Sequence, residues 1–345
     1  MDSIRRTFDV WRQSSWVAAQ QIELDKCPCC FAPDPEYLFD ANDLAAHIFV
    51  DRRLKRGRYS LCRACGAIFA ARRPSPETAE TYYELFPELE EKTHNIYPPP
   101  SRNSKGKVAR ANEIFGLIEQ RGLLKPDLSV LHVRADVGAL LKLLRDRLPA
   151  ATLHGLDYFA NNVRYLREEG FHVDKLSAAA IKLPPGAGYD LILANHHFTH
   201  ALDPRGDLAT LRSALKPGGH VLFYSEVDHS VLFDPASDLF SRIDVINNHK
   251  QLFVPETFEA LLRNGGFACE FLDRNRFMMT YLAAPADNPA PAPQATPEFL
   301  DRERRMIREW QKTAKRYRYP IAVVETVKPW LNWRRARKQK QKLAG

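Results

Sequence analysis

The chain has 345 residues, of which 45% are hydrophobic, and a formal net charge of +8. This length allows about two domains at roughly 150 residues each, and the apolar content suits a packed core. No stretch approaches the roughly 20 uninterrupted apolar residues of a membrane helix, and the start of the chain carries charges where a signal peptide would be apolar. We therefore expect a globular, cytoplasmic protein.

The first two predicted segments are a helix and a cysteine-rich module. Residues 1–25 are expected to form an amphipathic helix because apolar side chains recur near the helical period from Ile4 to Val17. Residues 26–73 contain two Cys-x-x-Cys pairs and few helix signals. Such pairs in a chain with only six cysteines favour a metal site over a disulfide framework.

The predicted ligands of a structural Zn²⁺ ion are Cys27, Cys30, Cys62 and Cys65. A two-residue gap lets one tight turn direct two thiolates at the same ion, and two such turns complete a tetrahedral site. Cys29 is an alternative ligand because the first run offers three thiols. The other interpretation is a set of buried or redox-active cysteines.

The remaining segments indicate an α/β domain between two linkers. Residues 74–106 are predicted to be a linker with a short helix that begins at Ser75-Pro76-Glu77. Residues 107–284 alternate between helical patterns and apolar runs, which predicts a parallel sheet with helices on both faces. The expected strands are 129–133, 152–157, 189–194, 219–226, 268–272 and 277–283.

The C-terminal part is predicted to be a proline-rich linker, 285–297, and a basic helical tail, 298–345. Residues 301–345 contain 15 Lys and Arg against four acidic residues, so the rest of the chain is slightly acidic. Trp330 and Trp333 precede a basic run, a combination that suits peripheral contact with an anionic membrane. A solvated tail without a partner is the alternative, and nucleic acid is the least favoured partner.

Several motifs, taken in order, resemble a bacterial group of class I S-adenosylmethionine-dependent methyltransferases that carry an N-terminal zinc-binding module. The motifs are Leu61–Phe69, Tyr189–His196, Leu215–Leu222 and Phe253–Phe258. The resemblance implies a Rossmann-like, seven-stranded, mostly parallel sheet preceded by a zinc-ribbon-like module. It also implies S-adenosyl-L-methionine as cofactor and an acceptor related to sugars, polysaccharides or secondary metabolites.

The resemblance places the cofactor turn after the first strand, at His132, Val133, Arg134, Asp136 and Gly138. The family typically has an acidic residue and three alternating glycines there, because glycine permits positive φ and close approach of the backbone to the ligand. Only Gly138 is retained. Arg134 and Asp136 could pair with the carboxylate and amine of the methionyl group, or the turn could be degenerate and bind no cofactor.

By the same resemblance, Asp157 and Tyr158 follow the second strand, where a carboxylate accepts the ribose hydroxyls. The alternative role of Asp157 is a helix cap. Asn195 and His196 are predicted to line the methyl-transfer site, with His196 positioning the acceptor or acting as base. His196 and His200 have a spacing that can hold a metal, but the sequence offers no third ligand nearby, and a structural histidine is the simpler interpretation.

Two functions follow from these residues. The first is methyl transfer from S-adenosylmethionine to an O, N or C nucleophile of a small molecule or glycan precursor. The second is a catalytically inactive methyltransferase fold that serves as a binding or assembly scaffold. The altered glycine pattern favours the scaffold, whereas the retained Asp157 and Asn195-His196 favour the enzyme.

Overall fold

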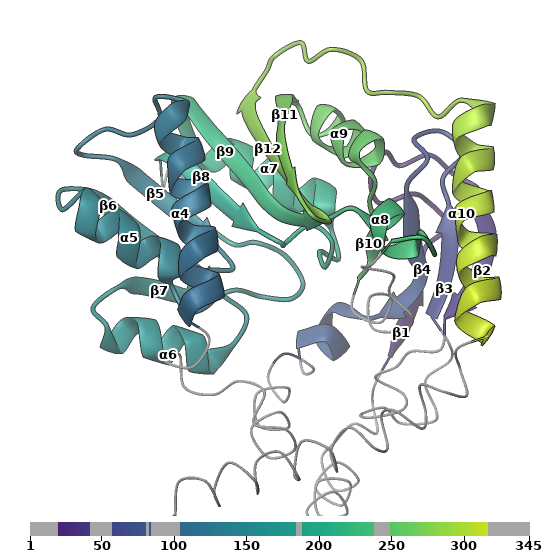
Figure 1. The fold of residues 1–345 in the computed structure, drawn as a ribbon, viewed down its shortest axis with the longest axis horizontal. Helices are drawn as coiled ribbons and strands as arrows, with labels where there is room; N and C mark the ends of the chain where they lie inside the picture. The colour runs from purple at the N-terminus through teal and green to yellow at the C-terminus, as the bar shows by residue number, and fades with distance from the viewer. Residues whose placement is uncertain are drawn as a thin grey trace, which may run out of the picture.

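The fold of the chain, taken from a computed structural model, consists of two sheets that lie side by side (Figure 1). The structure describes residues 20–41, 57–80, 83, 104–183, 188–237 and 249–316. Most of the helix expected at residues 1–25 lies outside these ranges. Gln21–Glu23, at the end of that expected helix, form strand β1 instead, because they pair with the edge of the smaller sheet.

The larger sheet has seven strands in the order β11-β12-β9-β8-β5-β6-β7. Strands β9 to β7 run parallel, and β12 and β11 add an antiparallel edge. The fold class predicted for this part of the sequence is confirmed. The strand bounds are Ser129–Val133 (β5), Thr152–Asp157 (β6), His172–Lys175 (β7), Tyr189–Asn195 (β8), Leu215–Val227 (β9), Phe267–Asn275 (β11) and Met278–Pro285 (β12).

Helices cover both faces of this sheet because consecutive residues of each parallel strand point to opposite faces. Val130 and Leu191 pack with α4 and α5 on one face, whereas Leu131 and Ile192 pack with α7 and α9 on the other. Helix α6 packs beside α5 and β7. The helix bounds are Ser104–Gln120 (α4), Ala139–Arg147 (α5), Ala160–Glu168 (α6), Pro204–Ala214 (α7) and Pro255–Asn264 (α9).

The order of the parallel strands creates a switch point at their carboxyl ends. The chain runs outward from β5 through β6 to β7 and then returns to the other side of β5 as β8. The connections that leave β5 and β8 therefore diverge to opposite sides. Open α/β sheets bind ligands at such points, so the predicted site residues are expected to meet here.

The smaller sheet contains the cysteine module and one strand from the larger domain. Its order is β1-β4-β3-β2, and β10, which lies between α8 and α9 in the chain, also pairs with β4. The module is therefore joined to the larger domain by backbone hydrogen bonds as well as by side chains. The bounds are Gln21–Glu23 (β1), Glu36–Ala41 (β2), Gly57–Leu61 (β3), Ile68–Pro74 (β4), His229–Phe233 (α8) and Gln251–Leu252 (β10).

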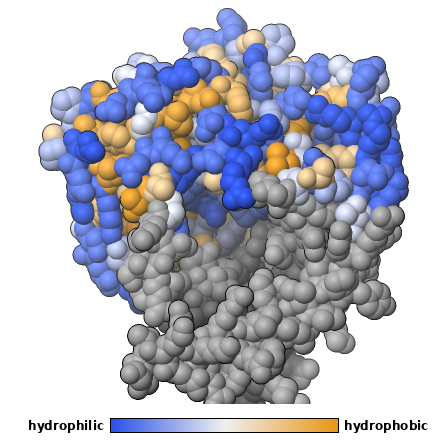
Figure 2. All heavy atoms as spheres, viewed as in Figure 1, coloured by the Kyte–Doolittle hydropathy of each residue, from blue (hydrophilic) through white to orange (hydrophobic). Residues whose placement is uncertain are grey.

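Helix α10, Pro297–Arg316, packs along the smaller sheet. Leu300, Ile307 and Trp310 are buried against Phe39 and Phe233, so this part of the predicted basic tail belongs to the folded body. The outer side of the helix is hydrophilic in the view of Figure 2. Residues 317–345, with both tail tryptophans, lie outside the described ranges. Among the helices that the structure describes, none is long and apolar enough to cross a membrane.

Candidate functional site

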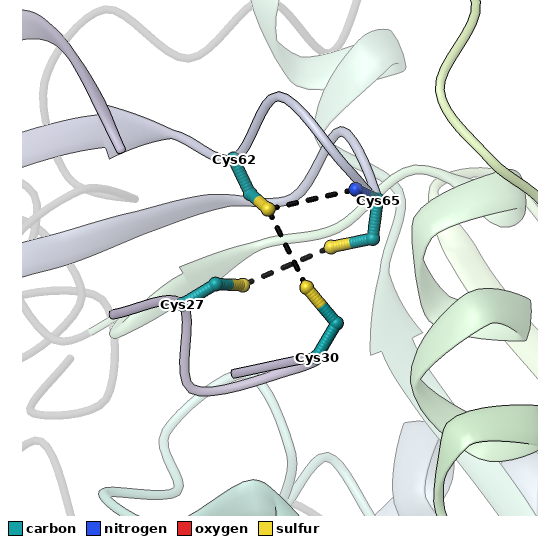
Figure 3. A group of neighbouring side chains, drawn as sticks. All are labelled: Cys27, Cys30, Cys62 and Cys65. Atoms are coloured by element: carbon teal, nitrogen blue, oxygen red, sulfur yellow. Dashed lines mark hydrogen bonds between the residues drawn. The ribbon is translucent and has the colours of Figure 1, made fainter. Parts of the chain in front are cut away.

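The four predicted zinc ligands converge on one point (Figure 3). One sulfur from each of Cys27, Cys30, Cys62 and Cys65 lies within 4.8 Å of every other. The Cys27 and Cys65 sulfurs are 3.7 Å apart and those of Cys30 and Cys62 are 3.5 Å apart. In a tetrahedral site with Zn–S bonds of about 2.3 Å, sulfurs lie about 3.8 Å apart, so this arrangement fits a Zn²⁺ ion.

The two cysteine loops share one backbone geometry. In each, the amide of the first cysteine donates to the carbonyl five residues on, and the amide four residues on donates back to the first cysteine (Cys27 with Ala32 and Phe31, Cys62 with Ala67 and Gly66). The residue after the second cysteine has positive φ in both, 62° at Phe31 and 74° at Gly66. Equal gaps in the sequence have thus folded into equal turns.

Cys29 lies outside the four-sulfur group, which corrects the alternative that it replaces one ligand. Its side chain is fully buried in the core, and its amide donates to the Cys27 sulfur at 3.4 Å. Its carbonyl accepts a hydrogen bond from Arg205 of α7 at 3.4 Å, and the Arg205 guanidinium also lies 5.0 Å from the centre of the Phe31 ring. The cysteine loop is thereby attached to the larger domain.

The turn after β5 keeps the backbone of a glycine-rich turn although two of the glycines are missing. Arg134, Asp136 and Gly138 have φ of 57°, 54° and 73°. Left-handed φ is uncommon for non-glycine residues and costs on the order of 1 kcal/mol each. At Gly138 a Cβ would lie 2.3 Å from Leu166 Cδ2, so a side chain there would require the buried Leu166 side chain to move.

The side chain of Arg134 crosses the switch point. Its guanidinium donates to the carbonyl of His196 and lies 5.6 Å from the centre of the Tyr158 ring. The side-chain amide of Asn195 donates to the Arg134 carbonyl at 3.1 Å, which links the ends of β5 and β8. The structure thus brings together the predicted residues Arg134, Tyr158, Asn195 and His196.

Asp136 has its partner in α4 instead. Its carboxylate forms an ion pair of 2.7 Å with Lys107 of α4. The two charges compensate each other at a half-exposed site. The Asp136 carboxylate, which was predicted to pair with the methionyl amine, is therefore already paired with the Lys107 ammonium group.

Both carboxylate oxygens of Asp157 are bound within the protein. One accepts from the amide of Asp136 at 2.7 Å, and the other accepts from the amide of Phe159 at 2.9 Å and the side chain of Asn162 at 3.0 Å. Burial raises the pKa of Asp157 to about 6. These contacts link the turn after β5 to the residues that precede α6. The N-cap of α6 is Phe159, without a side-chain cap, so the cap role considered for Asp157 is not found. A ribose would have to share the same carboxylate oxygens.

Tyr158 and two further predicted residues are buried partners rather than open groups. The Tyr158 hydroxyl is 3.0 Å from His197 Nδ1, and its ring stacks on Tyr83 at 4.4 Å. His132 Nε2 is 2.6 Å from the Tyr224 hydroxyl, and burial lowers the pKa of His132 to about 3. Val133 is fully buried in the core. His132 and Val133 can therefore meet a ligand only through their backbone.

Three histidines converge beside the switch point, and one of them was not predicted. His196, His200 and His249 each place a ring nitrogen within 4.8 Å of the other two. Their ring centres are 4.8 to 5.5 Å apart. His196 lies at the end of β8, His200 in the following turn, and His249 just before β10. No short spacing connects His249 to the other two; the pairing of β10 with β4 and the hydrogen bonds from Lys250 and Gln251 to Thr199 bring it near.

A fourth histidine orients His249. His229 Nδ1 is 3.2 Å from the Phe253 carbonyl, and His229 Nε2 is 2.8 Å from His249 Nδ1. A carbonyl only accepts, so neutral His229 carries its proton on Nδ1 and accepts at Nε2. His249 then donates from Nδ1, and its Nε2 is left with a free lone pair. Burial is the main cause that lowers the pKa of His196 and His249 well below the ordinary value.

Residues 105–270, which hold most of the seven-stranded sheet and the switch point, match the model of a family described as a methyltransferase domain. The α/β sheet with polar groups at its switch point defines a ligand-binding domain of the doubly wound class. The family match, over just under half of the chain, supports an enzyme of the methyltransferase type. No curated protein matches the sequence.

Several solved structures are similar in fold. A Pyrococcus horikoshii protein is 18% identical, with 53% of this chain and 92% of the other covered and a TM-score of 0.44. An S-adenosylmethionine-dependent methyltransferase of Mesorhizobium loti is 16% identical, with 51% and 99% covered and a TM-score of 0.41. A third, from Aquifex aeolicus, is 15% identical, with 51% and 97% covered and a TM-score of 0.40. Likeness at this level bears on neither substrate nor mechanism.

Proposed function

We propose that the protein transfers a methyl group from S-adenosylmethionine to an oxygen, nitrogen or carbon nucleophile of a small molecule or glycan precursor. The observation that carries the proposal is the turn after β5. Its backbone has positive φ at 134, 136 and 138, the positions where the family has glycine, and it lies within the segment that matches the methyltransferase family. A conformation kept at a cost in strain is the kind of feature that functional sites retain.

The bound cofactor would supply an activated methyl group, so the protein's own contribution is mainly alignment. The backbone of residues 134–138 would hold the methionyl end, and Asn195 holds this turn against the end of β8 through the Arg134 carbonyl. His196 has an Nε2 with no hydrogen-bond partner within the described part of the chain. As a neutral imidazole at the switch point, His196 can position an acceptor or take its proton.

The alternative, an inactive scaffold, has an observation of its own. The Arg134 guanidinium is held by the His196 carbonyl and by Tyr158, and the Asp157 oxygens are already bonded. A cofactor that enters the switch point must displace the arginine side chain or lie beside it. Arg134 is therefore the residue on which the two functions can be separated.

Isothermal titration with S-adenosylmethionine and S-adenosylhomocysteine distinguishes the proposals. Wild-type protein is expected to bind both. If wild type gives no heat at millimolar ligand and Arg134→Gly does, the arginine closes the site and the scaffold proposal replaces the enzyme. If neither protein gives heat, while both unfold cooperatively, cofactor binding by this turn is rejected.

We propose further that Cys27, Cys30, Cys62 and Cys65 hold a structural Zn²⁺ ion. Four thiolates leave no open position, so the ion would order the smaller sheet without entering the reaction. The equal turns of the two cysteine loops support this assignment. The acceptor and the contact of the C-terminal tail with anionic membranes remain proposals from the sequence, and flotation with anionic vesicles, with and without residues 320–345, tests the latter.

A further inference from the structure

We propose that His196, His200 and His249 form a second metal site, which binds a divalent transition-metal ion such as Zn²⁺ and keeps one coordination position open. Three imidazole nitrogens within 4.8 Å of one another offer the ligand set of an open, three-histidine site. Zn–N bonds of about 2.0–2.1 Å place ligand nitrogens about 3.3 Å apart, so small ring rotations complete the geometry.

Two of these rings each have a nitrogen that is left for a ligand in the part of the chain that the structure describes. His196 Nε2 is buried and has no hydrogen-bond partner within the described ranges. His249 Nε2 keeps a free lone pair because its Nδ1 donates to His229, which in turn donates to the Phe253 carbonyl. Metal-binding histidines characteristically have their second nitrogen oriented by such a partner. A buried imidazole nitrogen without a partner is costly, and a metal ion would remove that cost.

The backbone that carries the three rings is firmly held. The His196 amide donates to the Tyr224 carbonyl at 2.8 Å. In the turn that leads to His200, the Glu226 carboxylate accepts from the amides of Phe198 and Thr199 at 2.9 and 3.0 Å. Glu226 is fully buried, so few other arrangements of this turn can satisfy its charge.

The segment of His249 is held from two sides. The next residue, Lys250, donates its amide to the Thr199 carbonyl at 2.7 Å, and the Tyr59 hydroxyl of β3 donates to the His249 carbonyl at 2.8 Å. The cysteine module therefore positions one of the three proposed ligands. Preorganised ligands lose less entropy when the metal binds.

A second group of potential metal ligands in the described residues has its nitrogens already engaged. His154, His172 and Asp174 also lie within 4.8 Å of one another. Both ring nitrogens of His154 already have partners, the Tyr189 hydroxyl at 2.6 Å and Asp174 at 3.1 Å. His172 is largely exposed. That group is a hydrogen-bonded patch on β6 and the edge strand β7, and the nitrogens of His154 and the carboxylate of Asp174 already have partners within the protein.

The Arg134 guanidinium, which donates to the His196 carbonyl, carries a positive charge close to the site and would lower the affinity for a dication. If the protein is a methyltransferase as proposed, the open coordination position would bind the oxygen or nitrogen atom of the methyl acceptor. The metal would then replace His196 as the group that positions the acceptor.

Metal stoichiometry tests the site on the full chain. Protein stripped with a chelator is reloaded with Zn²⁺, freed of excess ion and analysed by mass spectrometry. Wild type is expected to hold about two ions per chain, one for each group of ligands. His200→Gln and His249→Gln should each hold about one. His172→Gln, which alters the third group, is the matched control and should hold about two.

X-ray absorption at the zinc edge of wild type keeps the test independent of whether a variant folds. The expected first shell contains nitrogen as well as sulfur neighbours. A sulfur-only shell, or one zinc per wild-type chain, overturns the proposal. So does a stoichiometry that neither histidine variant lowers.

Titration of the same proteins with S-adenosylmethionine separates this proposal from the proposed function. If the protein holds two zinc ions but binds no S-adenosylmethionine, the metal site is supported and the proposed methyltransferase function is rejected. Cofactor binding with only one zinc ion would reject the metal site alone.

Discussion

The cysteine cluster and the turn after β5 both hold residues at positive φ, but by different means. In the cluster, Phe31 and Gly66 adopt that conformation in two equal loops whose four thiols face one another. In the turn, Arg134 and Asp136 are held by contacts within the protein, through the Asn195 side chain and the Asp157 carboxylate. The cluster is therefore expected to depend on a ligand for its order, whereas the turn depends on its own packing.

The largest effect should come from removing one ligand of the cluster. Cys62→Ser should lose the zinc ion of this site, and the smaller sheet should unfold, because structural zinc supplies about 10 kcal/mol or more in small metal-dependent domains. Mass spectrometry of bound metal and limited proteolysis within residues 20–80 measure both effects.

Cys269→Ser is the matched control, because Cys269 lies in β11 outside the cluster. It should keep wild-type metal content and wild-type protease resistance. If Cys62→Ser does the same, the cluster does not depend on a metal and the comparison fails.

This contrast also explains what the sequence could predict. The four ligands follow from two short spacings, each of which folds into a local turn, so Cys27 and its partners could be assigned without knowing the fold. The parallel strands were predictable for a similar reason, since apolar runs between turn signals mark them. Strand β7, with only four residues and a mixed pattern, carries too little signal of this kind.

The switch point was predictable only in part. Arg134, Asn195 and His196 could be placed there by resemblance, but the ion pair of Asp136 with Lys107 and the three partners of Asp157 depend on packing between elements. His249 could not be found at all, because the pairing of β10 with the cysteine module and hydrogen bonds to Thr199 bring it to the site. Contacts between residues far apart in the chain leave no local pattern in a single sequence.

The turn after β5 is packed tightly against Leu166 at Gly138. Gly138→Ala adds a Cβ 2.3 Å from Leu166 Cδ2 at a residue with φ of 73°. Overpacking and positive φ together should lower the free energy of unfolding by about 2–4 kcal/mol. Urea denaturation measures the change.

Gly122→Ala isolates the conformational part of that cost. Gly122 has φ of 65°, but a Cβ there would meet nothing within 4 Å. We expect a loss of about 1 kcal/mol. Equal losses at the two glycines would show that Leu166 yields and that the turn is less tightly packed than the structure indicates.

The third prediction concerns the helix that covers the cysteine module. Glu303 of α10 is buried, and desolvation raises its pKa to about 7 from an ordinary value of 4.5. The folded state therefore holds a proton that the unfolded state releases, and the free energy of unfolding should fall as the pH rises from about 4.5 to about 7. Between these pH values the free energy of unfolding should fall by up to about 3 kcal/mol, and Glu303→Gln should abolish this fall.

Urea denaturation at pH 5 and pH 8 measures the slope. Glu298→Gln, at an exposed position of the same helix, controls for the loss of one acidic residue. If Glu303→Gln and wild type lose stability in parallel between the two pH values, the burial of this carboxyl does not govern the stability of α10.

The smallest effect tests the strain in the turn itself. At φ of 57°, position 134 should accept glycine more readily than alanine, although in ordinary backbone alanine is the more stable of the two. Arg134→Ala and Arg134→Gly both remove the contacts with the His196 carbonyl and the Tyr158 ring. Their difference therefore reports the backbone alone, and we expect Arg134→Gly to be more stable by about 1 kcal/mol. Denaturation of the two variants side by side measures it. An advantage for alanine would mean that the turn has relaxed out of the left-handed region, and with it the main structural support for a cofactor turn would be lost.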